Sequence, residues 1–212
     1  MGNKSHFFRQ SNGLSLVADY QFNNNLIDSV GGNNGTGTNI SYNVGAYGNE
    51  AVFNGSTSEV RTPNSTVWDI SDGTNDIPIK IEILVRLYDF NGLRYLVAKT
   101  PSGGSASGWE VVFGNNKIYI QVFDKLTSSV SYVACDMQYD QYGYSKIIIE
   151  YDGGYIFEGW SISVNNTTTG FEGDFTGYNG VAKSNTDATF GISGRRNDRR
   201  LDGVISQIKI YK

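Results

Sequence analysis

The sequence predicts an all-β protein, an antiparallel jelly-roll sandwich of two sheets. The composition supports this, because 14 Tyr, 11 Phe and many Thr, Val and Ile among 212 residues suit pleated, half-buried strands. Short apolar or alternating runs also recur between clusters of Gly, Asn, Asp and Ser, as in sandwiches and barrels. No segment keeps a helical period for three turns, and the lack of crossover helices excludes a parallel α/β fold.

In the first half of the chain, the first strand is expected at 14–22. Residues 51–53 and 59–61 flank Asn54-Gly55, a dipeptide typical of tight β-turns, and this pattern predicts a hairpin. Over 79–88, aliphatic residues alternate with polar ones, which predicts a strand with one buried face.

In the second half, Gly114-Asn115-Asn116 lies between apolar runs at 109–113 and 118–123 and predicts another hairpin. The other expected strands lie at 95–99, 130–135, 146–151, 160–164, 189–192 and 204–211. Long polar loops are expected at 31–39, 65–76, 101–108 and 179–186. These elements form one domain over 14–212, which follows an N-terminal arm at 1–13.

Charge and composition exclude several classes of protein. The formal net charge of -4 is unlike that of a nucleic-acid binder, which usually has a strongly basic face. No apolar run is long enough for a membrane-spanning helix, and residues 1–13 lack the apolar run of a signal peptide. The single cysteine, Cys135, lies in an apolar stretch and is interpreted as a buried, inert thiol.

Several segments occur in an order typical of one β-sandwich family. Leu16 to Asn23, with the acidic turn Leu26 to Ser29 and the Gly/Asn loop after it, forms the opening. Ile147 to Asp152 is an expected strand that ends in Tyr-Asp-Gly, and Gly191 to Tyr211 forms the close. This set resembles laminin-G-like domains of the concanavalin A-like lectin/glucanase superfamily. The resemblance covers 14–212 and implies the jelly-roll fold, but that fold hosts lectins, glycosidases, adhesion modules and virion proteins.

The motifs of glycosidases are missing from the sequence. The glucanases of that superfamily carry Glu-x-Asp-x-x-Glu on one strand, because glycoside hydrolysis needs a pair of carboxylates. The nearest match, Glu172-Gly173-Asp174, has no following Glu. The only histidine, His6, lies in the arm and offers no base to a serine or cysteine nucleophile in the domain. The sequence therefore predicts a protein that is not an enzyme.

The resemblance also implies a possible structural calcium ion, which many relatives hold between the first acidic turn and the final strand. Asp28 matches the acidic position, whereas Ser206 stands where many relatives carry an acid. Calcium takes about six to eight oxygen ligands, and Asp28 with backbone carbonyls is one way to supply them. The alternative is that Asp28 caps its own turn. Both interpretations stay open.

A glycan site on this fold would combine exposed aromatic and polar side chains on one sheet face. Tyr119, Gln121 and Phe123 alternate with aliphatic residues and are candidates. Arg86 and Tyr88 are further candidates on the same kind of face. The alternative is that all five side chains only pack over a sheet.

The densest cluster of charge contains Arg195, Arg196, Arg199 and Arg200. It lies between the last two expected strands, which predicts a hairpin tip. Guanidinium groups bind acidic groups through a planar fork, so the four arginines form a candidate partner-binding site. The alternative is a solvated tip.

These observations together favour a non-catalytic binding or structural module. The first hypothesis is a bacteriophage virion surface protein, a capsid decoration or a tail or fibre component with glycan adhesion. It rests on an adhesion-type fold that follows a short polar arm without a secretion signal, and the arm would contact other virion proteins. The alternative is a lectin-like, carbohydrate-binding module of a bacterial secreted or surface protein. An arm and free strand edges fit an oligomer, but a monomer fits equally well.

Overall fold

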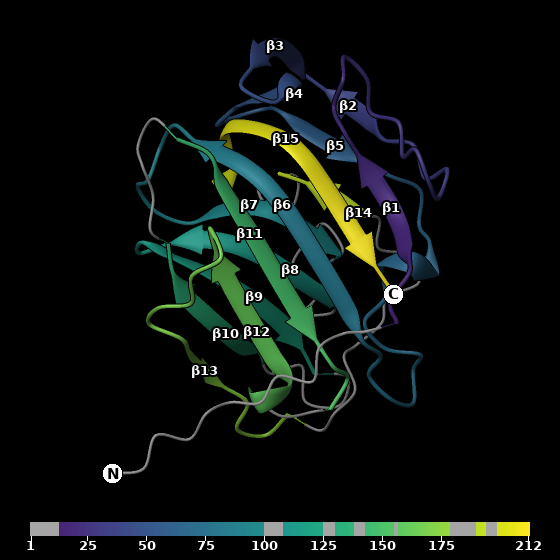
Figure 1. Cartoon of the computed structure of the whole chain (residues 1–212), viewed down its shortest axis with the longest axis vertical. Coiled ribbons are helices and arrows are strands. Elements are labelled where there is room, and N and C mark those ends of the chain that lie inside the picture. The colour runs from purple at the N-terminus through teal and green to yellow at the C-terminus, as the bar shows by residue number, and fades with distance from the viewer. Residues whose placement is uncertain are drawn as a thin grey trace.

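The computed structural model describes residues 13–99, 108–124, 130–137, 143–154, 157–178, 190–193 and 199–212. Within these residues the chain forms fifteen strands and two short 3-10 turns, η1 (Thr66–Trp68) and η2 (Phe157–Gly159). The strands make two facing sheets in which every named pair is antiparallel (Figure 1). This confirms the predicted sandwich. In the described part of the chain, no helix has the length and apolarity to cross a membrane.

The first sheet has seven strands and faces the viewer in Figure 1. Six of them follow the order β12-β11-β6-β15-β4-β3, and β1 also pairs with β15. Their bounds are Leu16–Tyr20 (β1), Ser41–Gly45 (β3), Gly48–Asn54 (β4), Ile79–Leu87 (β6), Ser145–Tyr151 (β11), Trp160–Val164 (β12) and Asp202–Tyr211 (β15).

The second sheet lies behind it and has eight strands, in the order β13-β10-β9-β8-β7-β14-β5-β2. Their bounds are Thr36–Thr38 (β2), Glu59–Arg61 (β5), Arg94–Lys99 (β7), Gly108–Gly114 (β8), Lys117–Phe123 (β9), Val130–Asp136 (β10), Glu172–Asp174 (β13) and Phe190–Ile192 (β14).

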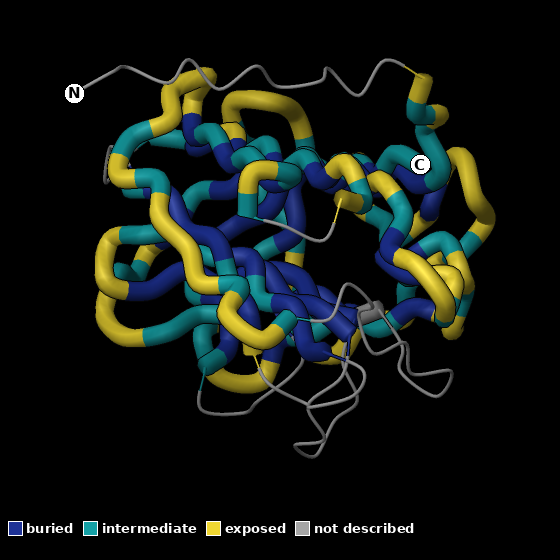
Figure 2. The backbone as a smooth tube through the Cα atoms, turned by 90° about the horizontal axis from the view of Figure 1, so that it is seen from below, coloured by how far each residue is buried: buried dark blue, intermediate teal, exposed yellow. Residues whose placement is uncertain are grey.

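The hydrophobic core lies between the two sheets, where Figure 2 shows the buried backbone in dark blue. Along β6 every second residue is buried, as the alternation over 79–88 predicts. Three fully buried tryptophans fill the largest volumes, and each such side chain contributes roughly 3 kcal/mol through apolar burial. The indole Nε1 of Trp109 also donates to the carbonyl of Trp68 at 2.6 Å, so this buried polar group is satisfied.

Strand β15 holds the seven-stranded sheet together. One edge of β15 pairs with β6, and the other pairs with β4 over 202–205 and with β1 beyond residue 207. A β-bulge interrupts β15, because Ile205 faces Val85 whereas Gln207 already faces Leu84. Ser206 is therefore an extra residue, at the place where β15 passes from one partner strand to the next.

The prediction of a hairpin at Asn54-Gly55 is wrong, because β4 and β5 belong to different sheets. The Oδ1 atom of Asn54 accepts the backbone N–H groups of residues 56–58 at 2.8–3.0 Å, which turns the chain out of the first sheet. The hydroxyl of Ser58 then donates to the carbonyl of Asn39 at 2.6 Å, beside β2, the partner of β5. A local side-chain cap therefore replaces the two-residue turn, and the connection crosses the sandwich.

The second expected hairpin is confirmed. Gly114 pairs with Lys117, and Asn115 and Asn116 between them have φ angles of 51° and 58°, as a type I′ turn requires. The sequence did not predict the short strands β2, β3 and β13, which lie at sheet edges. Their residues are largely exposed, so no apolar alternation marks them as strands.

Candidate functional site

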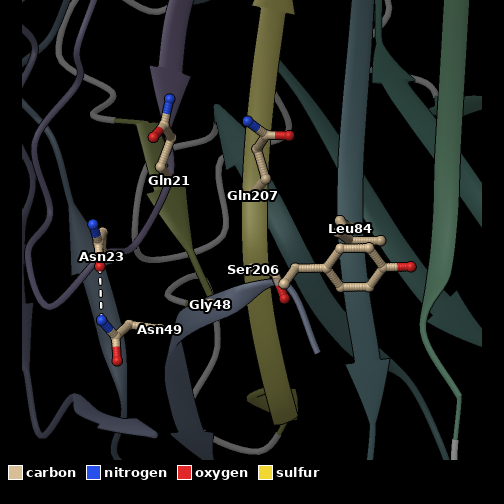
Figure 3. Close-up of a pocket in the computed structure, with 8 residues that line it drawn as sticks. Gln21, Asn23, Gly48, Asn49, Leu84, Ser206 and Gln207 are labelled. Carbon is tan, nitrogen blue, oxygen red and sulfur yellow. Dashed lines mark hydrogen bonds between the residues drawn. The ribbon is translucent and has the colours of Figure 1, made fainter. Parts of the chain in front are cut away.

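A pocket of about 300 Å³ opens on the outer face of the seven-stranded sheet, beside the bulge of β15. Its lining comes from the segment after β1, the β3–β4 turn, the start of β4, β6 and β15 (Figure 3). The lining residues are Gln21, Asn23, Tyr47, Gly48, Asn49, Leu84, Ser206 and Gln207. None of these side chains is charged, so a ligand meets amides, a hydroxyl and an aromatic ring. Convergent polar groups on an apolar base are typical of small-molecule sites.

The bulge of β15 explains why the pocket forms there. In a bulge, two residues of one strand oppose a single residue of its partner, and here Ser206 and Gln207 lie opposite Leu84. Ile205 and Ile208, on either side, are buried in the core. The bulge therefore turns two consecutive polar side chains to the outer face, where Figure 3 shows them beside Leu84.

Hydrogen bonds fix the amides of the pocket. The Nδ2 atom of Asn49 donates to Oδ1 of Asn23 at 2.7 Å, drawn dashed in Figure 3, and ties the start of β4 to the segment after β1. The Nε2 atoms of Gln21 and Gln207 each donate to the carboxylate of Asp19 at 3.2 Å. Asp19, on β1, is buried and so connects the two glutamines across the β1–β15 pair.

Glu50 is a fully buried carboxylate that reaches the pocket through Ser206. Its Oε2 atom accepts hydrogen bonds from Ser206 Oγ at 2.9 Å and from the Tyr144 hydroxyl at 2.5 Å. Its Oε1 atom lies 3.7 Å from Arg86 Nη2 and has no hydrogen-bond partner among the described residues. Burial and the bond to Glu50 raise the pKa of Tyr144, which keeps this phenol a neutral donor. Gly45 makes room here, because a Cβ atom there would lie 2.4 Å from the carboxylate.

A row of aromatic rings extends from the pocket across the same face. Tyr47, which is 64% exposed, meets Tyr144 edge-on with 5.1 Å between ring centroids. The guanidinium of Arg86 lies 5.2 Å from the centroids of both Tyr144 and Tyr88 and donates to the Tyr88 hydroxyl at 3.0 Å. Tyr47 belongs to both the pocket and the row. We call the pocket together with Tyr144, Arg86 and Tyr88 the outer-sheet site.

The structure places two of the five predicted glycan-binding residues in this site, namely Arg86 and Tyr88. The other three lie on β9 in the eight-stranded sheet, on the opposite face of the sandwich. Tyr119 and Gln121 are half-buried there, and Phe123 is only 4% exposed. The five residues therefore do not form one site, because β6 and β9 belong to different sheets. The ligand-binding role of each remains a prediction.

Asp28 is buried in the turn after β1. Its Oδ1 atom accepts the backbone N–H groups of Asp19, Val30 and Gly31 at 3.0–3.1 Å, and its Oδ2 atom accepts the backbone and side-chain N–H groups of Asn33 at 3.1 and 3.3 Å. Burial raises the pKa of this carboxyl, but the backbone donors outweigh burial and hold the pKa below its usual value.

These donors give Asp28 the geometry of a turn cap, the second of the two interpretations that the sequence left open. Among the described residues there is no group of three or more His, Cys, Asp or Glu side chains placed to hold a metal ion. A calcium ion at Asp28 remains a prediction, and it would compete with five N–H donors for the same two oxygens.

The prediction of a hairpin tip at the arginine cluster is wrong, because the two flanking strands do not pair. β14 belongs to the eight-stranded sheet and β15 to the seven-stranded sheet. Arg195 and Arg196 lie outside the described residues, and Arg199 is half-buried. Arg200 is 8% exposed and its Nη1 atom lies 2.8 Å from Glu59 Oε2, which ties the connection to β5. A partner-binding role for these arginines remains a prediction.

Sequence reasoning missed most of the outer-sheet site, including Gln21, Tyr47, Asn49 and Glu50. Asn, Gln and Tyr occur throughout this chain, so their presence at single positions carries no signal. One local signal exists, since Ser206-Gln207 breaks the period-two pattern of 204–211 with two consecutive polar residues. Such a break is typical of a bulge.

No protein-family model and no curated protein matches the sequence, but many solved structures match its fold. One is domain 4 of AbnA, a GH43 extracellular arabinanase from Geobacillus stearothermophilus, in complex with arabinotriose. It is 18% identical with a TM-score of 0.58, and the match covers 94% of this chain and 93% of that chain. The shared property is the fold.

Bacterial toxins provide further matches. The binding domain of Paraclostridial Mosquitocidal Protein 1 is 14% identical with a TM-score of 0.70, over 92% of this chain and 48% of that chain. The binding domain of botulinum neurotoxin serotype G is 16% identical with a TM-score of 0.67, over 92% and 47%. This chain therefore spans about half the length of these binding domains. At these identities the resemblance to laminin-G-like domains remains a prediction.

Proposed function

We propose that the protein is a non-catalytic glycan-binding module whose ligand lies in the outer-sheet site. The observation that carries the proposal is the uncharged pocket of about 300 Å³ beside the exposed ring of Tyr47. Sugars present hydroxyl groups, which bond to amides and hydroxyls, and C–H faces, which pack on aromatic rings. The pocket offers both kinds of contact within one lining.

Two further observations support binding without catalysis. Glycoside hydrolysis uses two carboxylates that flank the scissile bond, and none of the residues that line the pocket carries one. Glu50, behind the pocket, is engaged by Ser206 and Tyr144. Domain 4 of the arabinanase, which shares this fold, was solved with arabinotriose, so the fold is compatible with an oligosaccharide ligand.

The test is a glycan-array screen of the purified protein, run with calcium and again with chelator, followed by calorimetry on the best ligand. We expect saturable binding in the wild type. Tyr47→Ala should weaken it roughly ten- to thirty-fold, which corresponds to about 1.4–2 kcal/mol. The melting temperature should barely change, because Tyr47 is mostly exposed.

Tyr119→Ala is the matched control, because it removes the same kind of ring from the opposite face. It should change the dissociation constant by less than two-fold. If Tyr119→Ala abolishes binding and Tyr47→Ala does not, the ligand lies on the eight-stranded sheet. If no glycan binds the wild type, the proposed function is wrong.

The placement of this module in the cell or particle is a narrower proposal, which rests on the sequence alone. We propose a bacteriophage virion surface, as a capsid decoration or a tail or fibre component, with a bacterial secreted or surface protein as the alternative. Mass spectrometry of purified virions tests it. Recovery of the protein only from non-virion fractions would favour the alternative.

A further inference from the structure

We propose that the outer-sheet site selects uncharged glycans and excludes acidic ones, such as chains of uronic acids or glycans with sialic acid. This inference rests on the proposed glycan binding and adds the class of ligand. It follows from the way one buried carboxylate, Asp19, orients the pocket amides, and from the charges around them.

Hydrogen bonds to Asp19 orient the side-chain amides of Gln21 and Gln207 and so determine which atom of each amide faces a ligand. The carboxylate oxygens of Asp19 accept hydrogen bonds from Gln21 and Gln207, so the groups that face Asp19 are their Nε2 donors, both at 3.2 Å. The two Oε1 acceptors remain, and among the described residues no donor reaches them. Figure 3 shows the amide nitrogen of Gln207 on the side toward Gln21 and its oxygen on the side toward Leu84. The two glutamines therefore present acceptors to a ligand, which suit the hydroxyl donors of a neutral sugar.

The position of Asp19 is itself fixed by the turn that follows β1. Its backbone N–H donates to Asp28 Oδ1 at 3.0 Å, and its carbonyl accepts the N–H of Ser29 at 2.9 Å and the hydroxyl of Ser29 at 3.2 Å. Asp19 as a whole residue is only 6% exposed. Because Asp19 is held in this way, the amides of Gln21 and Gln207 are already oriented before a ligand binds.

The charges beside the pocket also disfavour an anion. Asp19 borders it on β1, and the buried carboxylate of Glu50 lies behind Ser206. The guanidinium of Arg86 lies against Glu50 and between two tyrosine rings. Lys209 stands opposite Asp19 in the β1–β15 register, so a carboxylate lies beside it. An acidic sugar would meet like charges and acceptor oxygens, which is costly in a partly buried site.

The experiment compares matched ligands, an oligomer of galactose and an oligomer of galacturonic acid of the same length, by calorimetry at low salt. We expect the wild type to bind the neutral oligomer at least about ten-fold more tightly. Asp19→Asn adds a donor in place of the carboxylate and frees the glutamines to turn. It should weaken the neutral ligand and reduce the preference to within about three-fold.

Glu82→Gln is the control variant, because it removes the same charge from the same sheet face outside the pocket, where Glu82 pairs with Lys80 and Lys146. It should keep the full preference. Gln207→Leu provides a second test if Asp19→Asn does not fold, since it removes one acceptor and should weaken the neutral oligomer about ten-fold.

The outcomes separate the two proposals. Equal or tighter binding of the acidic oligomer by the wild type overturns this inference and leaves glycan binding intact. An unchanged preference in Asp19→Asn, or its loss in Glu82→Gln, also overturns it. If the glycan-array screen finds no ligand of either class, the proposed function fails, and this inference fails with it.

Discussion

Replacement of Asp28 by Asn tests whether this carboxylate stabilises the fold through hydrogen bonds or through a metal ion. In the wild type, its two oxygens accept five N–H donors. Asn keeps Oδ1 for Asp19, Val30 and Gly31, but it turns an NH₂ group toward the two donors of Asn33. Two charge-assisted hydrogen bonds are then lost, and the other three become neutral bonds.

The expected cost follows from these bonds. Each hydrogen bond to a charged group contributes roughly 1.5–3 kcal/mol, and water can partly replace the bonds to Asn33 because that residue is half-exposed. We expect Asp28→Asn to lower the free energy of unfolding by about 3 kcal/mol. For a domain of this size, this corresponds to a decrease of roughly 6–12 °C in the melting temperature.

The assay is thermal unfolding at several pH values, with calcium and with chelator. Because the folded-state pKa of Asp28 is lowered, its stabilisation is complete above the unfolded-state pKa of about 4 and is lost as the pH falls through the folded-state pKa. The difference between wild type and variant should therefore be largest near neutral pH and shrink in acid. Chelator should leave the wild type unchanged. If chelator lowers the wild type to the level of the variant and calcium restores it, a bound ion provides the stability and the hydrogen-bond argument is wrong.

Two further substitutions test the packing around the site and between the sheets. Gly45→Ala should destabilise the protein by about 1–3 kcal/mol and weaken glycan binding, because the new Cβ atom would lie 2.4 Å from the Glu50 carboxylate. In a Glu50→Ala background this loss of stability should largely disappear. A loss that persists there would show that the new Cβ atom does not clash with Glu50. Arg200→Met should lower the free energy of unfolding in urea by about 2–4 kcal/mol, because it leaves Glu59 without the nearer of its two arginine partners. Stability equal to the wild type would show that this ion pair does not stabilise the fold.

Much of the fold could be predicted because its signals are local. The alternation over 79–88 and the Asn115-Asn116 turn both depend on a few neighbouring residues, and both are confirmed. The turn at Asn54-Gly55 has an equally strong local signal, yet it fails. The Oδ1 atom of Asn54 accepts the backbone N–H groups of residues 56–58, and the hydroxyl of Ser58 donates to the carbonyl of Asn39, which lies fifteen residues before Asn54. Distant contacts therefore decide which turn forms.

The same distinction explains the candidate site. Alternation identified Arg86 as a residue on an outer face, but it did not show which sheet carries β6 or that Glu50 lies against it. The pocket joins residues near positions 21, 48 and 206, and only the pairing of β15 with β1, β4 and β6 brings them together. No periodicity in the sequence encodes that arrangement.

The all-β class, most of the strands and the lack of a glucanase motif can be read from residue types and from their spacing along single strands. Strand pairing places Tyr119 and Arg86 on opposite faces and brings Asp19 and Glu50 to one pocket. Local patterns do not encode this arrangement, because pairing across a sheet joins residues far apart in the chain. A single bulged residue, Ser206, then decides which side chains reach the surface.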